Sequence, residues 1–149
     1  MFILSFLVLV LDQLTKFFAL RNIPYAASIP VIKNIFHLSL VKNTGSAFGL
    51  FKNMAAVFVL VAVLSAIVIG RYLLSKKDKL DIITRISLHL ILAGAVGNLI
   101  DRLRFGYVVD FLDFRIWPVF NIADSAITIG ALLFGWQIIT KSNTKNQKP

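Results

Sequence analysis

Four long apolar stretches constrain this chain more than any other feature. They run from Met1 to about Leu20, from about Met54 to Leu74, from about Ile83 to Ile100 and from about Phe120 to Thr140. A helix that crosses the hydrocarbon core of a bilayer needs about 20 such residues. Of the 149 residues, 58% are hydrophobic, more than the roughly half expected of a soluble domain. We therefore predict a mainly α, polytopic membrane protein with four transmembrane helices in a single membrane-embedded domain, 1–149, and both termini on one side.

The connections between these stretches differ in composition. The first, 21–53, contains "IPVIKNIFHLSLVKNTGSAFGLF", which is rich in β-branched and aromatic residues and predicts short strands. The connection 103–119 is also apolar and aromatic, so the two together predict a small β-rich platform on one side of the membrane. In contrast, the connection 75–81 is short and charged, and the polar tail 141–149 is expected to be disordered.

The net charge of +9 indicates contact with anionic headgroups, because the basic residues flank the apolar stretches. A nucleic-acid partner is not expected, because no basic stripe is interleaved with stacking aromatic residues. Seven basic residues fall on each side, but their density in the short second connection and the tail predicts cytoplasmic termini. The first stretch lacks a basic n-region and a cleavage site, so we expect it to be a retained span.

Several kinds of site are excluded by composition. The chain has no cysteine, which excludes disulfides, thiolate zinc sites and a cysteine nucleophile. His37 and His89 are isolated, so a metal site built from histidines is not expected. The acidic residues are all aspartates: Asp12, Asp78, Asp81, Asp101, Asp110, Asp113 and Asp124.

Ionisable residues within or beside membrane spans are costly and are therefore candidates for function. Asp12 and Lys16, in "LDQLTK", lie four residues apart and share a helix face. They could form an ion pair that holds the end of the span at the interface, or they could belong to a site. Asn43, Thr44 and Gly45, in "VKNTGSAF", could form a turn or a backbone loop that approaches a bound chain.

A third group closes the third span in "GAVGNLIDRLR". Asn98, Asp101 and Arg102 can share one helix face, and Gly94 and Gly97 are small enough for close helix contact. Capping of the helix end and an Asp101–Arg102 pair would explain two of the polar residues. They would not explain an asparagine at membrane depth.

The last group lies around the start of the fourth span. Asp110, in "VVDF", has apolar neighbours and must be paired, protonated or reached by water. Asn121 and Asp124, in "FNIAD", are three residues apart and either could cap the helix. If the first, third and fourth spans meet at one face, Asp12, Asn98, Asp110 and Asp124 lie at one depth. Paired carboxylates there would suit acid–base chemistry on water.

These motifs together resemble bacterial lipoprotein signal peptidase, or signal peptidase II. The matching segments are "DQLTK", "NTGSAF", "GNLIDRLRFGYVVDF" and "FNIADSAI", in the expected order from Met1 to about Gln137. The resemblance implies a four-helix aspartyl peptidase of the bacterial cytoplasmic membrane, with a β-cradle and an active site near the outer face. It implies cleavage of diacylglyceryl-modified prolipoproteins just before the lipidated cysteine, without a cofactor.

Residue roles follow from the same resemblance. The catalytic pair would be Asp110 and Asp124, and peptide-like inhibitors would bind at the same site. Asn43 and Arg102 would contact the substrate backbone, Asp101 would be structural, and Asp113 is expected to be an interfacial charge. The connection between the catalytic aspartates, "FLDFRIWPVFNIA", is short for this family. Supporting or substrate-binding residues would be Asp12, Asn43, Gly45, Asn98, Arg102 and Asn121.

Other functions remain open from the residues alone. A proton-coupled transporter would use Asp12, Asp101 and Asp124 as a relay, and its acids should be spread through the membrane depth. A scaffold gives no reason for the asparagine–aspartate pairs. A serine–lysine peptidase would need Ser46 or Ser125 near Lys16, but no spacing singles out such a pair.

Overall fold

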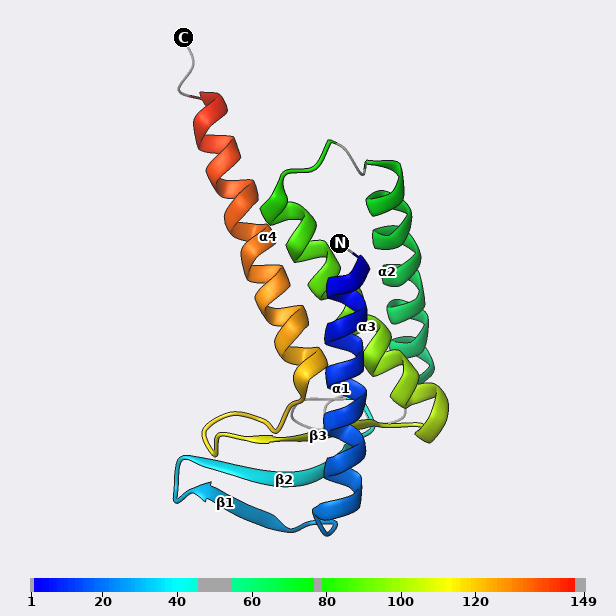
Figure 1. Ribbon diagram of the computed structural model, residues 1–149, viewed down its shortest axis with the longest axis vertical. Coiled ribbons are helices and arrows are strands. Elements are labelled where there is room, and N and C mark those ends of the chain that lie inside the picture. The colour runs from blue at the N-terminus through cyan, green and yellow to red at the C-terminus, as the bar shows by residue number, and fades with distance from the viewer. Residues whose placement is uncertain (1, 46–54, 77–78, 147–149) are drawn as a thin grey trace.

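Four helices and three strands form the structure, a computed structural model that describes residues 2–45, 55–76 and 79–146. In Figure 1 the helices form a bundle and the strands form a sheet at one end of it. The start of α1 and the end of α4 lie toward the opposite end. In chain order the elements are α1 (Phe2–Asn22), β1 (Ser28–Ile32), β2 (Phe36–Asn43), α2 (Ala55–Ser75), α3 (Ile82–Phe105), β3 (Val108–Asp113) and α4 (Ile122–Asn146).

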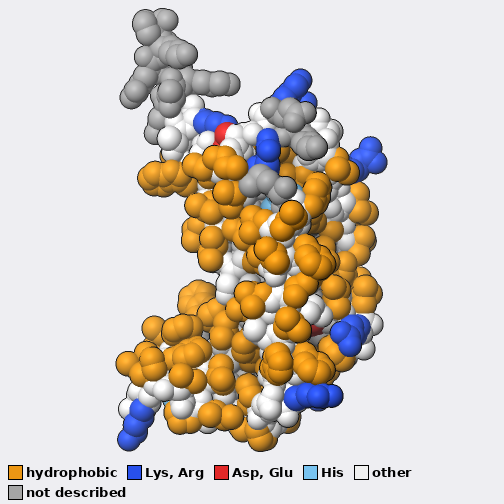
Figure 2. All heavy atoms as spheres, in the orientation of Figure 1, with side chains coloured by type: hydrophobic (Ala, Val, Ile, Leu, Met, Phe, Trp, Pro, Cys, Tyr) orange, Lys and Arg blue, Asp and Glu red, His pale blue; other side chains and the backbone are white. Residues whose placement is uncertain are grey.

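All four helices are long and apolar enough to cross a membrane. Their outward residues are mostly large hydrophobic side chains, which in water would be an aggregation hazard. Figure 2 shows apolar side chains over the length of the bundle, with Lys and Arg gathered toward its two ends. The chain is thus a multi-pass membrane protein, as the sequence predicted.

The third helix lies at the centre of the bundle and packs against α1, α2 and α4. Glycines allow its close approach to α4. A Cβ atom added at Gly94 would meet the Ala123 carbonyl oxygen, and one added at Gly130 would lie 2.7 Å from the Ser87 carbonyl oxygen. This bears out the close contact expected at Gly94.

Two helix ends differ from the prediction. The third helix continues to Phe105 and ends at Gly106, which adopts the left-handed conformation with φ 78° and donates its N–H to the Arg102 carbonyl. The signal for this end was Gly106 rather than the loss of apolar residues at Ile100. The fourth helix continues to Asn146, so the expectation of a disordered tail was wrong up to that residue.

The sheet joins the two apolar connections, as expected. Its strands run antiparallel in the order β1–β2–β3. The register pairs Val41 with Asp110 and Lys42 with Val109, after an irregularity that begins at Leu38. A small core of Ala19, Ile23, Leu40, Val109 and Phe111 fixes the sheet to the end of α1. The third strand contacts α1 and α3, so its side chains reach into the bundle.

Candidate active site

Two aspartates meet where β3 approaches the start of α4. Asp110 lies in β3 and its side chain is buried, whereas Asp124 lies in the first turn of α4 and is half-buried. Both contact Asn121, the residue just before α4. The sequence prediction that these two carboxylates converge is therefore matched by the geometry.

Asp110 is held by two neutral amides. Its Oδ1 accepts a hydrogen bond from Asn121 Nδ2 at 2.7 Å, and its Oδ2 accepts one from Asn43 Nδ2 at 2.9 Å. Asn43 can reach it because the register places Val41 opposite Asp110, and Asn43 lies two residues further along the same face. Asn43 Oδ1 in turn accepts from the Gly45 N–H, so the turn expected at "NTG" also orients the Asn43 amide.

Asp124 is held from two sides. Its Oδ1 accepts a hydrogen bond from Asn98 Nδ2 at 2.7 Å. Its main-chain N–H donates to Asn121 Oδ1 at 2.8 Å, which makes Asn121 the N-cap of α4. Asn121 thus has two tasks, capping α4 with its oxygen and holding Asp110 with its nitrogen.

The orientation of these amides is set by groups that can only donate. Lys16 Nζ donates to Asn98 Oδ1 at 3.0 Å, so the NH₂ group of Asn98 faces Asp124. The Asp124 main-chain N–H fixes Asn121 in the same way, with its NH₂ group toward Asp110. Each amide therefore presents N–H to a carboxylate.

A charged cluster of Asp12, Lys16 and Asp101 lies beside these amides. Lys16 Nζ is 2.9 Å from Asp12 and 3.0 Å from Asp101, and all three side chains are at most 3% exposed. The ion pair of Asp12 and Lys16, one of the two alternatives that the sequence left open, is formed, but it is buried and shared with a third residue. Asp101 pairs with Lys16, so the alternative in which Asp101 pairs with Arg102 does not apply.

The charged cluster also joins the elements of the site. Asp12 Oδ1 accepts from the Ala123 N–H at 2.9 Å and so caps α4 from α1. Asp101 Oδ2 accepts from the Val109 N–H at 3.0 Å and anchors β3. A Cβ atom added at Gly97 would lie 2.6 Å from Asp12 Oδ2, so a larger residue there would have to displace the Asp12 carboxylate.

Gln13 was missed by the sequence reasoning. Its Nε2 donates to Asp12 Oδ2, Asp101 Oδ1 and the Gly97 carbonyl at 3.1 to 3.2 Å. The only signal was its position within "DQLTK", next to Asp12. The contact of Lys16 with Asp101 was also missed, because helix spacing reveals neighbours on one helix and not on another.

Arg102 and Asp113 lie outside the amide network. Arg102 is half-buried, donates to the Asn98 carbonyl oxygen at 3.4 Å and lies over the Phe58 ring. Asp113 was expected to be an interfacial charge, but it is buried and accepts from Ser39 and Arg115. Burial works against ionisation of Asp113, yet these hydrogen bonds hold its pKa below the usual range.

The electrostatics of Asp110 suit proton transfer. Burial, and then the nearby charge of Asp124, raise the pKa of Asp110 to about 7, against the opposing hydrogen bonds from Asn43 and Asn121. Near neutral pH this carboxyl group can therefore both hold and release a proton, as a general acid or base must.

An apolar groove of about 470 Å³ opens beside Asp124. Figure 2 shows the molecular outline hollowed between the bundle and the sheet. The apolar lining of the groove beside Asp124 suits an extended, apolar chain whose backbone would pass the carboxylates. The residues that line it are Phe114, Ile116, Trp117, Phe120, Asp124, Ser125, Thr128 and Ile129.

The aspartates of the site are not arranged as metal ligands. Within 2–45, 55–76 and 79–146, no group of three or more His or Asp side chains is placed to hold a metal ion. The aspartates of the site instead bind amides, backbone N–H groups and Lys16.

Comparisons with known proteins agree with these observations. A family model described as signal peptidase (SPase) II matches residues 4–140. The chain is 51% identical to a lipoprotein signal peptidase of Moorella thermoacetica, over 99% of this chain and 97% of that protein. It is 45% identical to a lipoprotein signal peptidase of Halothermothrix orenii, over 91% of this chain and 94% of that protein. A solved bacterial membrane enzyme superposes with a TM-score of 0.89 at 30% identity, covering 99% of this chain and 92% of that one.

Proposed function

The chain belongs to the signal peptidase II family, and we propose that it hydrolyses the bond between the signal peptide of a prolipoprotein and its diacylglyceryl-modified cysteine. It is an aspartyl peptidase by family. The observation that carries the proposal is the pair of aspartates, Asp110 and Asp124, bridged by asparagine amides beside an apolar groove.

The catalytic step uses a water molecule between the two carboxyl groups. Asp124 is the base: Asn98 donates to its Oδ1, and Oδ2 accepts no hydrogen bond from the described residues, so Oδ2 is available to the water. Asp110 is the acid, because its raised pKa keeps a proton on it below about pH 7. As the water oxygen attacks the scissile carbonyl carbon, Asp124 takes a water proton and Asp110 protonates the carbonyl oxygen.

Collapse of the tetrahedral intermediate restores both groups. The bond from carbon to nitrogen breaks, Asp124 gives its proton to the leaving amine, and Asp110 recovers its proton from the hydroxyl group. The products are the signal-peptide carboxylic acid and the free amine of the lipidated cysteine, and the pair is ready for another cycle. The partly desolvated site strengthens these interactions.

Substrate contacts follow from the arrangement around the pair. The apolar groove receives the apolar residues of the signal peptide and the acyl chains reach the surrounding membrane lipids. Asn43, Gly45 and Arg102 contact the substrate backbone, and peptide-like inhibitors occupy the same place. Asp12, Asn98 and Asn121 act on substrate only through the positions of Asp110 and Asp124.

We further propose that residues 1–149 form a single domain embedded in the bacterial cytoplasmic membrane. Both termini are cytoplasmic, and the sheet lies at the outer face. Support comes from the basic residues at the end opposite the sheet, which include Lys76, Lys79 and Lys141. The transporter alternative has no support in the geometry. Asp12 and Asp101 are both held by Lys16, and α2 contains no acidic residue, so the aspartates of the described residues do not form a relay through the bundle.

The test is cleavage of a diacylglyceryl-modified prolipoprotein peptide by the purified chain in detergent, with a chelator present. Asp110→Asn and Asp124→Asn should each reduce turnover at least about 10³-fold, because each removes a group that transfers protons in the transition state. An unlipidated peptide should not be cleaved. Thermal unfolding of each variant shows whether it is folded.

Near-normal turnover in either folded variant would refute the catalytic pair. Equal cleavage of the unlipidated peptide would refute the substrate class while leaving the pair in place. A matched control is Asp113→Asn, since Asp113 is also buried in β3 but binds Ser39 and Arg115 rather than the catalytic amides. It should retain activity.

A further inference from the structure

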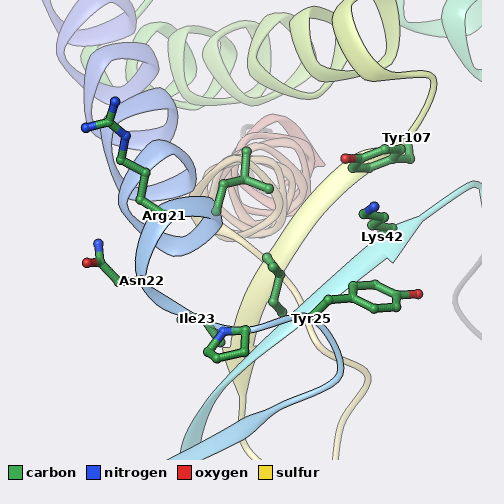
Figure 3. Close-up of a pocket in the computed structure, with 9 residues that line it drawn as sticks. Arg21, Asn22, Ile23, Tyr25, Lys42 and Tyr107 are labelled. Atoms are coloured by element: carbon green, nitrogen blue, oxygen red, sulfur yellow. The ribbon is translucent and has the colours of Figure 1, made fainter.

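A second pocket lies where the end of α1 meets the sheet, away from the catalytic pair. Its volume is about 380 Å³. It is lined by the last residues of α1, the segment that follows α1, Leu40 and Lys42 of β2, and Tyr107, which directly precedes β3. Figure 3 shows the Lys42 ammonium between the rings of Tyr25 and Tyr107. The ammonium lies 5.0 Å from the Tyr25 ring centroid and 5.3 Å from that of Tyr107.

Lys42 has no acidic partner among the described residues. The ion pairs of that part of the chain involve other cations, and Asp110 in the neighbouring strand is bound to Asn43 and Asn121. Two aromatic faces hold the ammonium by cation–π attraction, which orders the side chain without neutralising its charge. The pocket therefore presents a fixed, uncompensated positive charge.

Charge is distributed unequally around this end of the molecule. Four aspartates here are turned inward and are at most 5% exposed: Asp12, Asp101, Asp110 and Asp113. The exposed charged residues described at this end are all basic: Arg21, Lys33, Lys42, Arg104 and Arg115. A surface of this kind attracts anions.

The position of the pocket along the membrane normal indicates which kind of anion it would bind. Phe17 and Phe18, one turn before the end of α1, are exposed apolar residues that face lipid. Arg21 stacks over the Phe17 ring at 4.6 Å and points away from Lys42 in Figure 3. Tyrosine, lysine and arginine at the end of a span mark the level of the lipid headgroups, so the pocket opens at that level.

We propose that this pocket binds the headgroup of an anionic phospholipid, with the lipid phosphate against the Lys42 ammonium. The apolar lining residues Ile23 and Leu40 would contact the glycerol and the first carbons of the acyl chains. Because Lys42 directly precedes Asn43, such a lipid would also steady the strand that carries a partner of Asp110.

The experiment counts bound lipids on the full chain in detergent by native mass spectrometry, during titration with phosphatidylglycerol or phosphatidylcholine. Lys42→Gln should weaken phosphatidylglycerol binding about fivefold, which corresponds to about 1 kcal/mol for one basic residue at an anionic surface. Lys33→Gln is the matched control, because Lys33 is an exposed lysine in the turn between β1 and β2 that does not line the pocket. It should change binding less than twofold.

Three results would overturn the proposal. Equal losses in Lys42→Gln and Lys33→Gln would show general surface charge and no site. Equal binding of phosphatidylcholine would show no preference for anionic lipid. Displacement of the lipid by millimolar inorganic phosphate would show a free-phosphate site. Lys42→Arg keeps the charge and should keep binding, which separates loss of the site from loss of fold. The readout does not depend on peptidase activity.

Discussion

The charged cluster and the proposed catalytic pair, Asp110 and Asp124, are two groups of aspartates in one bundle that are held by different kinds of partner. Asp12 and Asp101 share the ammonium of Lys16 at 2.9 and 3.0 Å. Asp110 and Asp124 instead face the neutral amides of Asn43, Asn98 and Asn121. An ion pair fixes the charge of a carboxylate, whereas an amide holds its position and leaves it able to gain or lose a proton. The difference separates acids that support the fold from acids suited to chemistry.

Removing the cation of the charged cluster should have the largest effect on stability. Lys16→Met leaves two buried carboxylates without compensation, and we expect a loss of about 3–5 kcal/mol in the free energy of unfolding. Unfolding in detergent measures it, with the exposed Lys33→Met as control. Adding Asp12→Asn and Asp101→Asn to Lys16→Met should recover part of the loss, because no unpaired charge then remains. A loss below about 1 kcal/mol in Lys16→Met would contradict the role assigned to the charged cluster.

A smaller effect is expected from crowding the same cluster without changing its charge. In Gly97→Ala the new Cβ atom would lie 2.6 Å from Asp12 Oδ2 and displace it from Lys16 and Ala123. We expect a destabilisation of about 1–3 kcal/mol in thermal unfolding. Gly135→Ala is the control, since an added Cβ atom there meets nothing within 4 Å. It should be neutral or stabilising, and equal behaviour of the two variants would show that the close packing is unimportant.

The proposed catalytic pair should respond to pH, and the asparagine amides should set the pKa of Asp110. With Asp110 as the acid, kcat should fall about tenfold per pH unit above about pH 7, as Asp110 loses its proton. The hydrogen bond from Asn43 favours the ionised form, so Asn43→Ala should raise the pKa of Asp110 and move this fall to higher pH. Ser39→Ala removes a hydrogen bond to Asp113 instead and should leave the profile in place. A shift to lower pH in Asn43→Ala would mean that Asp110 is not the acid.

The smallest effect is expected at the far end of the bundle, where an ion pair is open to water. Lys141 and Asp81 join α4 to the start of α3, with side chains 58% and 29% exposed. Lys141→Gln should cost no more than about 1 kcal/mol. Lys141, by its hydrogen bond, holds the pKa of Asp81 below the usual range. The contribution is therefore present above about pH 4 and lost as pH falls below that. A loss as large as that of Lys16→Met would remove the distinction between buried and exposed pairs.

Much of the fold could be predicted because the bilayer permits few solutions. The lengths of the apolar stretches predicted four helices, and the β-branched connections predicted the sheet. Asp12, Asn98, Asp110 and Asp124 could be expected to converge because each is costly in an apolar setting. The third and fourth helices extend beyond the apolar stretches that end at about Ile100 and Thr140, since polar residues can continue a helix beyond its apolar part.

Contacts between distant segments could not be predicted from local spacing. The spacing of Asp12 and Lys16 indicates one helix face, but it does not reveal that Asp101 completes the charged cluster from α3. Asp113 was expected to be an interfacial charge. Its burial depends on the strand register and on an irregularity in β2, which local spacing does not reveal. The hydrogen bonds of Gln13 likewise depend on how α1 and α3 pack.

The cap that Asp12 provides for α4 has a consequence for the order of events during synthesis. The first span is made long before the Ala123 N–H that it will cap. Until then, an unpartnered aspartate in a newly inserted helix would oppose its entry into lipid. Lys16 lies one turn away and can neutralise Asp12 within the first span alone. Lys16, which later binds Asp12 in α1 and Asp101 in α3, thus first neutralises Asp12 as α1 enters the membrane. The site is complete only when α4, the last span to be made, is in place.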